Sequence, residues 1–161
     1  MSYKNTSGRL RDYVTLADTS FSKQAVSTTL VALDDTTVTY TPTSGAAQVF
    51  YECMCQIAWN PDYNASIMCA RLQYSENSGA SWTTLTGTEV FAGNFSGGAD
   101  YNWHTYVLTY QIAPWTGSRQ LRLAARAHGA SSEFTWGRSY NASGSEGVGA
   151  CPVITVYSSM S

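Results

Sequence analysis

The stretch 65–85 constrains the fold most, because it predicts a strand, a tight turn and a second strand. Apolar residues occupy every second position from Met68 to Tyr74, which is the period of a strand with one buried face. Small and polar residues fill positions 75–81, and Gly79 among them accepts a positive φ without steric cost. A Trp-Thr-Thr-Leu run follows, and these residues favour strands. The sequence therefore predicts a β-hairpin.

The turn of this hairpin resembles the Asp-box, S-x-D-x-G-x-[ST]-W, which occurs in sialidases and in many unrelated β proteins. Ser75, Gly79, Ser81 and Trp82 match the motif, and Asn77 stands where that family has aspartate. In those families the box is scaffold and repeats around a propeller. Here it occurs once, whereas a propeller would repeat it around four or more blades. The motif indicates a β fold and identifies no activity.

Other alternating segments predict strands over 26–33, 36–41, 49–59, 103–112, 119–128 and 152–157. Two Gly-rich stretches, 87–102 and 137–149, predict long loops. With the hairpin these segments give about eight strands and no helix. The expected fold is an all-β, antiparallel β-sandwich, and the jelly roll is the commonest eight-stranded case.

Charge is scarce in this chain, at 12% of residues against about 25% in an average domain. The net charge of −2 predicts no nucleic-acid partner and no anionic membrane partner. No apolar run approaches the roughly 18 residues of a membrane span, and the N-terminus lacks the apolar region of a signal peptide. We therefore expect a protein that assembles in the cytoplasm.

Residues 1–24 show no sustained periodicity and carry four of the nine basic residues against two acidic ones. We expect them to be an arm or irregular lead-in that precedes a β-sandwich domain over 25–161. Such a segment is either an ordinary solvated tail or an arm that docks on an acidic neighbour. Under the second interpretation Arg9 and Arg11 are the docking residues.

Cys53 and Cys55 are two positions apart on one face of a predicted strand. Their side chains therefore lie side by side and are not expected to form a disulfide with each other. A Cys-x-Cys pair alone is not a zinc pattern. Together with Cys69 and Cys151 they are predicted to be buried free thiols, with no metal and no cofactor.

No catalytic constellation stands out from the sequence. The two histidines, His104 and His128, both lie in predicted strands whose alternation already explains them. There is no G-x-S-x-G elbow, no glycine pattern for phosphate and no cluster of carboxylates. The sequence therefore predicts that the protein is not an enzyme.

Aromatic residues make up 13% of the chain. Trp103, Trp115 and Trp136 fall at strand ends or in loops, where an exposed ring stacks on a sugar or fills a neighbour's pocket. Arg122 and Arg126 point outward from their strand and offer bidentate hydrogen bonds to carboxylates across an interface. A plain solvated face is the other interpretation of that arginine pair.

Several of these pieces together resemble the tumour-necrosis-factor-like jelly rolls of tailed-bacteriophage virions, which form trimeric capsid decoration (cement) proteins and fibre heads. The resemblance covers 25–161 and is carried by the turn at 74–82, the alternating 119–128 strand, the 137–149 loop and the closing strand 153–157. It implies a homotrimer on the capsid surface that clamps neighbouring subunits of the major capsid protein. Four residues are candidates for either the trimer core or the sandwich core: Tyr51, Tyr106, Leu108 and Tyr110.

The alternative is a receptor- or carbohydrate-binding head of a tail fibre, or a lectin-like module. Trp103, Trp115 or Trp136 would then be its stacking platforms, and the two Gly-rich loops would carry specificity. Against a fibre head, nothing before residue 25 resembles a repetitive shaft.

Overall fold

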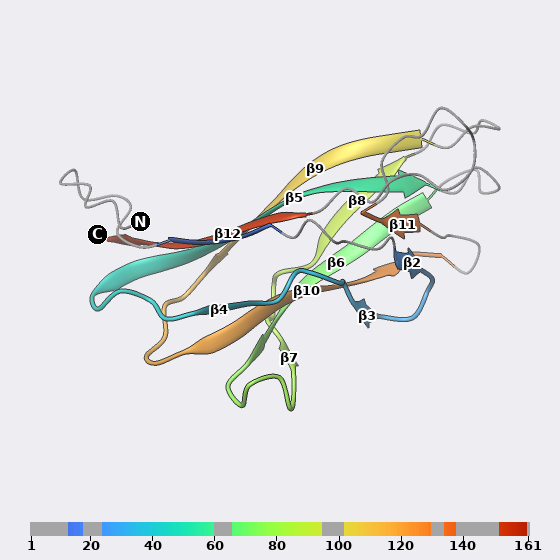
Figure 1. The fold of residues 1–161 in the computed structure, drawn as a ribbon. Coiled ribbons are helices and arrows are strands. Elements are labelled where there is room, and N and C mark those ends of the chain that lie inside the picture. Colours follow the sequence, from blue (N-terminus) through green and yellow to red (C-terminus); the bar gives the residue numbers. More distant parts are fainter. Residues whose placement is uncertain are drawn as a thin grey trace.

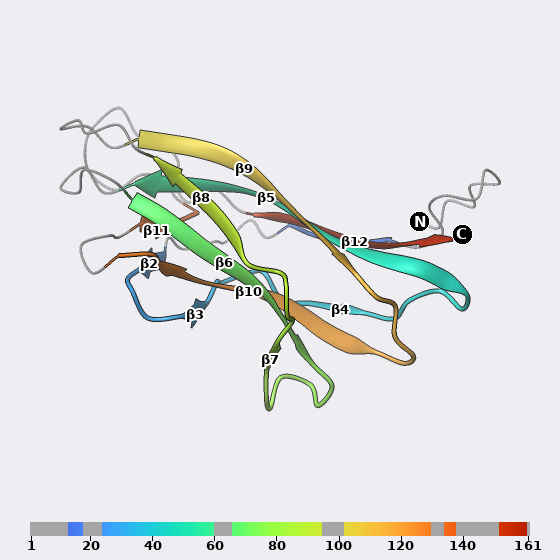
Figure 2. The same cartoon turned by 180° about the vertical axis from the view of Figure 1, so that it is seen from behind.

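The computed structural model describes residues 13–17, 24–59, 66–94, 102–129, 134–137 and 152–160. Within these ranges it contains twelve β-strands and no helix. The strands form two six-stranded antiparallel sheets that lie against each other (Figures 1 and 2). The prediction of an all-β antiparallel sandwich is confirmed.

Each sheet is built around one long pair of strands. Sheet A consists of β1 (Tyr13–Ala17), β12 (Val153–Met160), β5 (Ala46–Trp59), β9 (Asn102–Ile112), β11 (Phe134–Trp136) and β2 (Gln24–Val26). Sheet B consists of β3 (Val31–Ala32), β4 (Val38–Tyr40), β10 (Arg119–Ala127), β6 (Ser66–Ser75), β7 (Thr83–Thr84) and β8 (Val90–Asn94). β5 pairs with β9 on one edge and with β12 and β11 on the other.

The strand order is that of a jelly roll. Eight principal strands follow one another along the chain, namely β1, β3 with β4, β5, β6, β8, β9, β10 and β12. Numbered in that sequence, sheet A has the order 1-8-3-6 and sheet B the order 2-7-4-5. This alternation of strands between two sheets is the jelly-roll connectivity.

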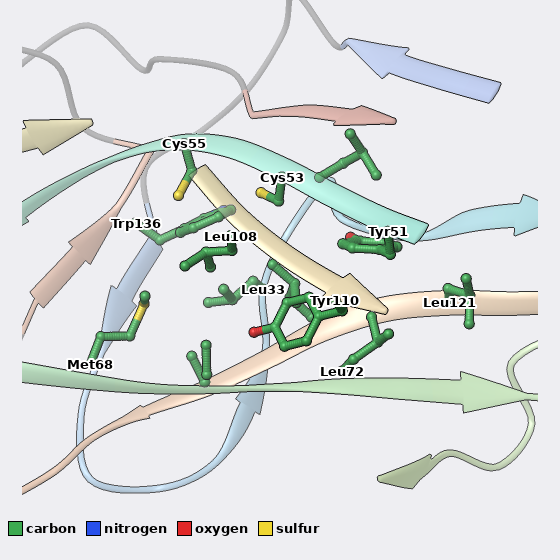
Figure 3. Packing of buried hydrophobic residues seen from close by; sticks show 14 of the residues in the cluster. Leu33, Tyr51, Cys53, Cys55, Met68, Leu72, Leu108, Tyr110, Leu121 and Trp136 are labelled. Carbon is green, nitrogen blue, oxygen red and sulfur yellow. The ribbon is translucent and has the colours of Figure 1, made fainter. Parts of the chain in front are cut away.

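The core lies between the sheets and follows the alternation seen in the sequence. Every second residue of β5 from Val49 to Ile57 is buried, and these residues face the apolar positions of β6 and β10 (Figure 3). Tyr51, Leu108 and Tyr110 belong to this sandwich core, and the half-buried Tyr106 packs against it.

The hairpin turn after β6 is held by its own side chains. The Oγ atom of Ser75 accepts a hydrogen bond from the Gly79 amide at 2.9 Å, and the Asn77 side-chain oxygen accepts one from the Ser81 amide at 3.0 Å. The side-chain nitrogen of Asn77, Nδ2, also donates a hydrogen bond to Ser81 Oγ at 2.8 Å. Asn77 therefore serves this turn through its side-chain hydrogen bonds, as Asn and Asp both do in turns, and Gly79 has the expected positive φ, at 88°.

Three expectations about the strands are corrected. The segment 26–33 is not one strand, because β2 pairs with β11 in sheet A and β3 pairs with β10 in sheet B, so the chain must bend between them. Residues 87–102 are not one loop, because β8 pairs with β6 over 90–94 and buries Ala92. Residues 13–17 are not irregular, because β1 pairs with β12 along its whole length. The 137–149 loop lies outside the described residues after Gly137.

Candidate functional site

The outer face of sheet A carries a row of apolar side chains across three strands. Val153 of β12 lies opposite Met54 of β5, and Met54 lies opposite Val107 of β9. Val107 is 65% exposed and Met54 is 48% exposed, so this row lies open on the surface. We call Val153, Met54 and Val107 the apolar row.

Two aromatic rings extend this face. Phe50 and Tyr157 lie opposite each other on β5 and β12, and their rings are stacked with centroids 5.0 Å apart. The Tyr157 hydroxyl donates a hydrogen bond to Glu52 at 3.1 Å. Burial, and then this bond to Glu52, raise the pKa of Tyr157. Glu52 is the one charged residue at the outward positions of β5, β9 and β12, so the face has little charge.

The outer face of sheet B has the opposite character, because arginines cover it. Arg71 lies opposite Ala124, which places it diagonally between Arg122 and Arg126 of β10. Arg71 pairs with Glu89 at 2.6 Å. This cationic face agrees with the prediction that Arg122 and Arg126 point outward.

Both predicted arginines are held in defined positions. Arg122 Nε donates to Gln73 Oε1 at 2.9 Å, and its guanidinium carbon lies 3.8 Å from the centre of the Trp82 ring. Burial lowers the pKa of Arg122. Arg126 Nη1 donates to the carbonyl oxygens of Ala127 and His128, at 3.2 and 3.4 Å. Neither guanidinium forms an ion pair with a described carboxylate.

The third surface lies at the end of the sandwich, where the loop 113–118 connects β9 to β10 and carries Trp115. The Arg119 guanidinium lies 4.8 Å from the Tyr74 ring and 5.4 Å from the Trp115 ring. Arg119 also pairs with Glu76. The Trp115 ring packs edge to face with Tyr40, at 6.2 Å and 74°. Charge and aromatic surface therefore meet at Trp115.

Trp115 lines two hollows of the surface. One, of about 340 Å³, is lined by Tyr74, Ile112 and Arg119 among others. The other, of about 430 Å³, is lined mainly by residues of the segments 41–46 and 114–117. The Trp115 Nε1 atom is enclosed and has no hydrogen-bond partner in the described structure. Of the three predicted stacking residues, Trp115 alone is a half-buried ring shown to line a cavity.

The other predicted tryptophans differ. Trp136 is fully buried and its Nε1 donates to the Asp34 carbonyl at 3.1 Å. It is a core residue and not a stacking platform, because β11 pairs with both β2 and β5 and its alternation turns Phe134 and Trp136 inward. Trp103 lies in β9 opposite Ala58, and its side chain is outside the described part of the structure. Arg9 and Arg11 also lie outside the described residues.

Several residues of these surfaces were missed by sequence analysis. Val107 and Met54 had a usable signal, since each is an apolar residue on the outward parity of its strand. Arg119 and Glu76 had no such signal in the sequence, because only the fold brings the end of the β6 hairpin next to the start of β10.

Within the described ranges, no three His, Cys, Asp or Glu side chains come together in a group that could hold a metal ion. Both His104 and His128 are exposed and contact aromatic rings, those of Tyr106 and Phe91 respectively. No helix that could span a membrane is present in the described parts of the chain.

No protein-family model matches the chain, and no curated protein matches its sequence. The fold and the three surfaces are therefore the basis for a proposed function.

Proposed function

We propose that the protein is a structural virion protein, a homotrimeric capsid decoration (cement) protein that binds and stabilises an assembled phage capsid. It would act on the capsid surface by binding and would catalyse no reaction. The observation that supports this most is the apolar row on the outer face of sheet A, next to the stacked Phe50 and Tyr157 rings.

The partners proposed for this face are second and third copies of the same chain. Glu52 is the only charged residue at the outward positions of β5, β9 and β12, and its carboxylate already accepts a hydrogen bond from the Tyr157 hydroxyl. Such a face does not strongly repel a copy of itself. The 38 residues of β1, β12, β5 and β9 cover about 600 Å² at a rise of ~3.3 Å and a strand spacing of ~4.8 Å, somewhat less than the roughly 800 Å² per partner of a stable interface. Closed cyclic symmetry then limits the assembly to a small ring.

Stabilisation of a capsid follows from linkage. A protein that binds the assembled shell and not the free subunits lowers the free energy of the shell by the binding free energy. The outer face of sheet B would be available in such a trimer, and Arg122 and Arg126 would supply contacts to carboxylates of the major capsid protein. Arg9 and Arg11 would add a second basic contact.

Light scattering across a dilution series tests the trimer. The wild-type protein should have three times the 17.5 kDa mass of one chain. Val107→Glu should shift the mass toward the monomer, because three carboxylates would meet in an apolar interface. Phe91→Glu is the matched control, since Phe91 is also an exposed large apolar residue but lies in β8 of sheet B. A monomeric wild type would contradict the proposal.

Co-sedimentation with capsids assembled from the major capsid protein of the same genome tests the partner. The wild type should sediment with capsids and not with the unassembled capsid protein. Arg9→Ala with Arg11→Ala should weaken this binding more than Lys4→Ala with Lys23→Ala, which removes the same charge. Deletion of 1–24 is unsuitable, because it also removes β1. Failure of the wild type to sediment with capsids would remove the capsid from the proposal.

A further inference from the structure

The two hollows beside Trp115 are separate from the surfaces used above. Residues of the connection from β9 to β10 line both of them. Figure 2 shows this connection at one end of the sandwich. These hollows are therefore not part of the proposed function. Both volumes, about 340 and 430 Å³, fall within the range of small-ligand sites, about 300–1,000 Å³.

The charges in this region cancel. Arg119 offers hydrogen-bond donors and Glu76 offers acceptors, but the two form an ion pair. The Arg119 guanidinium is also fixed against the rings of Tyr74 and Trp115. Among the described residues, Arg119 is the one charged residue that lines either hollow. Glu76 lines neither of them, but its pairing with Arg119 offsets the positive charge from outside, so this site does not select for an anion or a cation. It suits a neutral ligand that carries both donors and acceptors.

The two hollows have complementary linings and share Pro114, Trp115 and Thr116. The first also contains apolar side chains, including Leu85 and Ile112. Hydroxyl residues line much of the second: Thr41, Thr43, Ser44 and Thr116. A ligand that fits both is extended, with flat C–H-rich surfaces for the indole and hydroxyl groups for the threonines and serine.

These are the properties of a chain of pyranose rings, and we propose that the Trp115 hollows bind a neutral oligosaccharide. The sugar faces stack on Trp115, which is half-buried and amphipathic. Packing against Tyr40 and Arg119 holds the indole, while its enclosed Nε1 has no acceptor in the described structure.

The test is a titration of the ¹⁵N-labelled protein with neutral tetrasaccharides of glucose, mannose, galactose and N-acetylglucosamine. The indole Nε1–H signal of Trp115 is followed by NMR, and the affinity is measured by calorimetry. At least one tetrasaccharide should shift this signal. Trp115→Ala should weaken its binding roughly tenfold or more, and Trp115→Phe should retain part of it. Phe91→Ala, which removes an exposed ring on sheet B, should bind as the wild type does.

Three results would overturn the proposal. The first is that no tetrasaccharide shifts the Trp115 signal. The second is that Trp115→Ala, shown by circular dichroism to be folded, binds with unchanged affinity. The third is preferential binding of an acidic oligosaccharide such as tetragalacturonate, which would show that Arg119 acts as a free cation. None of these results alters the mass measured by light scattering, so failure of this inference is distinguishable from failure of the trimer.

Discussion

The guanidinium of Arg122 lies 3.8 Å over the ring of Trp82, so a residue of β10 rests on the hairpin turn that follows β6. Arg122 also donates to Gln73 of β6, and Gln73 donates to Thr84 of β7 at 3.2 Å. One chain of contacts thus joins three strands of sheet B. The planar guanidinium makes both the stacking and the directed bond possible, which a lysine would not reproduce.

A double-mutant cycle should detect this contact. Arg122→Ala and Trp82→Ala should each destabilise the protein, and their effects should be coupled by about 1 kcal/mol, the size of a partly desolvated cation–π contact. Urea unfolding gives the four free energies. Arg126→Ala combined with Trp82→Ala is the control, because Arg126 bonds to backbone carbonyls, and its effect should add. Additive effects of Arg122→Ala and Trp82→Ala would show that the stacking contributes nothing.

Two buried tyrosines should respond in opposite ways to loss of the hydroxyl. Tyr51 donates to the Thr36 carbonyl at 2.6 Å, whereas the Tyr110 hydroxyl is buried without a partner in the described structure. The two rings are neighbours, with centroids 6.3 Å apart. Tyr51→Phe should cost about 1–3 kcal/mol, because it leaves a buried carbonyl unpaired, and Tyr110→Phe should be neutral or stabilising.

Urea unfolding of the two variants measures this difference, and each serves as the control for the other. They remove the same atom from the same core, so a general effect of repacking would appear in both. Equal losses of stability would contradict the assigned bonding.

Alkaline pH should destabilise the protein. Burial raises the pKa of Tyr51 and of Tyr110 above the ordinary value of 10.0. The hydrogen bond with Cys55, and then burial, raise the pKa of Cys53 above 9.0. In the unfolded chain these groups lose their protons first, so their contribution is complete below pH about 9 and is lost as the pH rises.

The free energy of unfolding, measured with urea from pH 8 to 11, should therefore be constant at first. It should then fall by up to about 1.4 kcal/mol per pH unit for each group. Tyr110→Phe should lessen the fall, because one titrating group is gone. A stability that does not change up to pH 11 would mean that these hydroxyls and thiols are solvated in the folded protein.

The sequence was informative wherever one strand has one buried face. The alternation at 49–57 and 121–127 describes the core of both sheets, because burial follows parity there except at the small Ala124, which is buried on the outward parity. The turn at 75–81 was equally readable, since its hydrogen bonds are all local.

Structural features that depend on the pairing of distant segments could not be predicted from the sequence. Trp136 is in the core because β11 lies between β2 and β5, which are far away in sequence. β1 is regular because the edge of β12 is open to it. The contact of Arg119 with Tyr74 and Glu76 likewise joins residues more than 40 positions apart, so no local pattern predicts it.

The described cysteines should be unreactive in the folded protein. Cys53, Cys55 and Cys69 are free and buried, as predicted, and the Cys69 thiol donates to the Glu89 carboxylate at 2.7 Å. Burial, and then that bond, raise the pKa of Cys69, so the reactive thiolate is disfavoured there.

A Cys151→Ser variant isolates these three thiols, since Cys151 lies outside the described residues. Treated with an aromatic disulfide reagent at neutral pH, the folded variant should react slowly, at the rate at which its core opens, and the urea-unfolded variant should react at once with three equivalents. The excess label taken up by the wild type reports Cys151 alone. Rapid labelling of the folded variant would mean that one of the three thiols is reached without opening of the core. Slow labelling that accelerates with urea, in step with unfolding, would show that all three thiols are reached only when the folded structure opens.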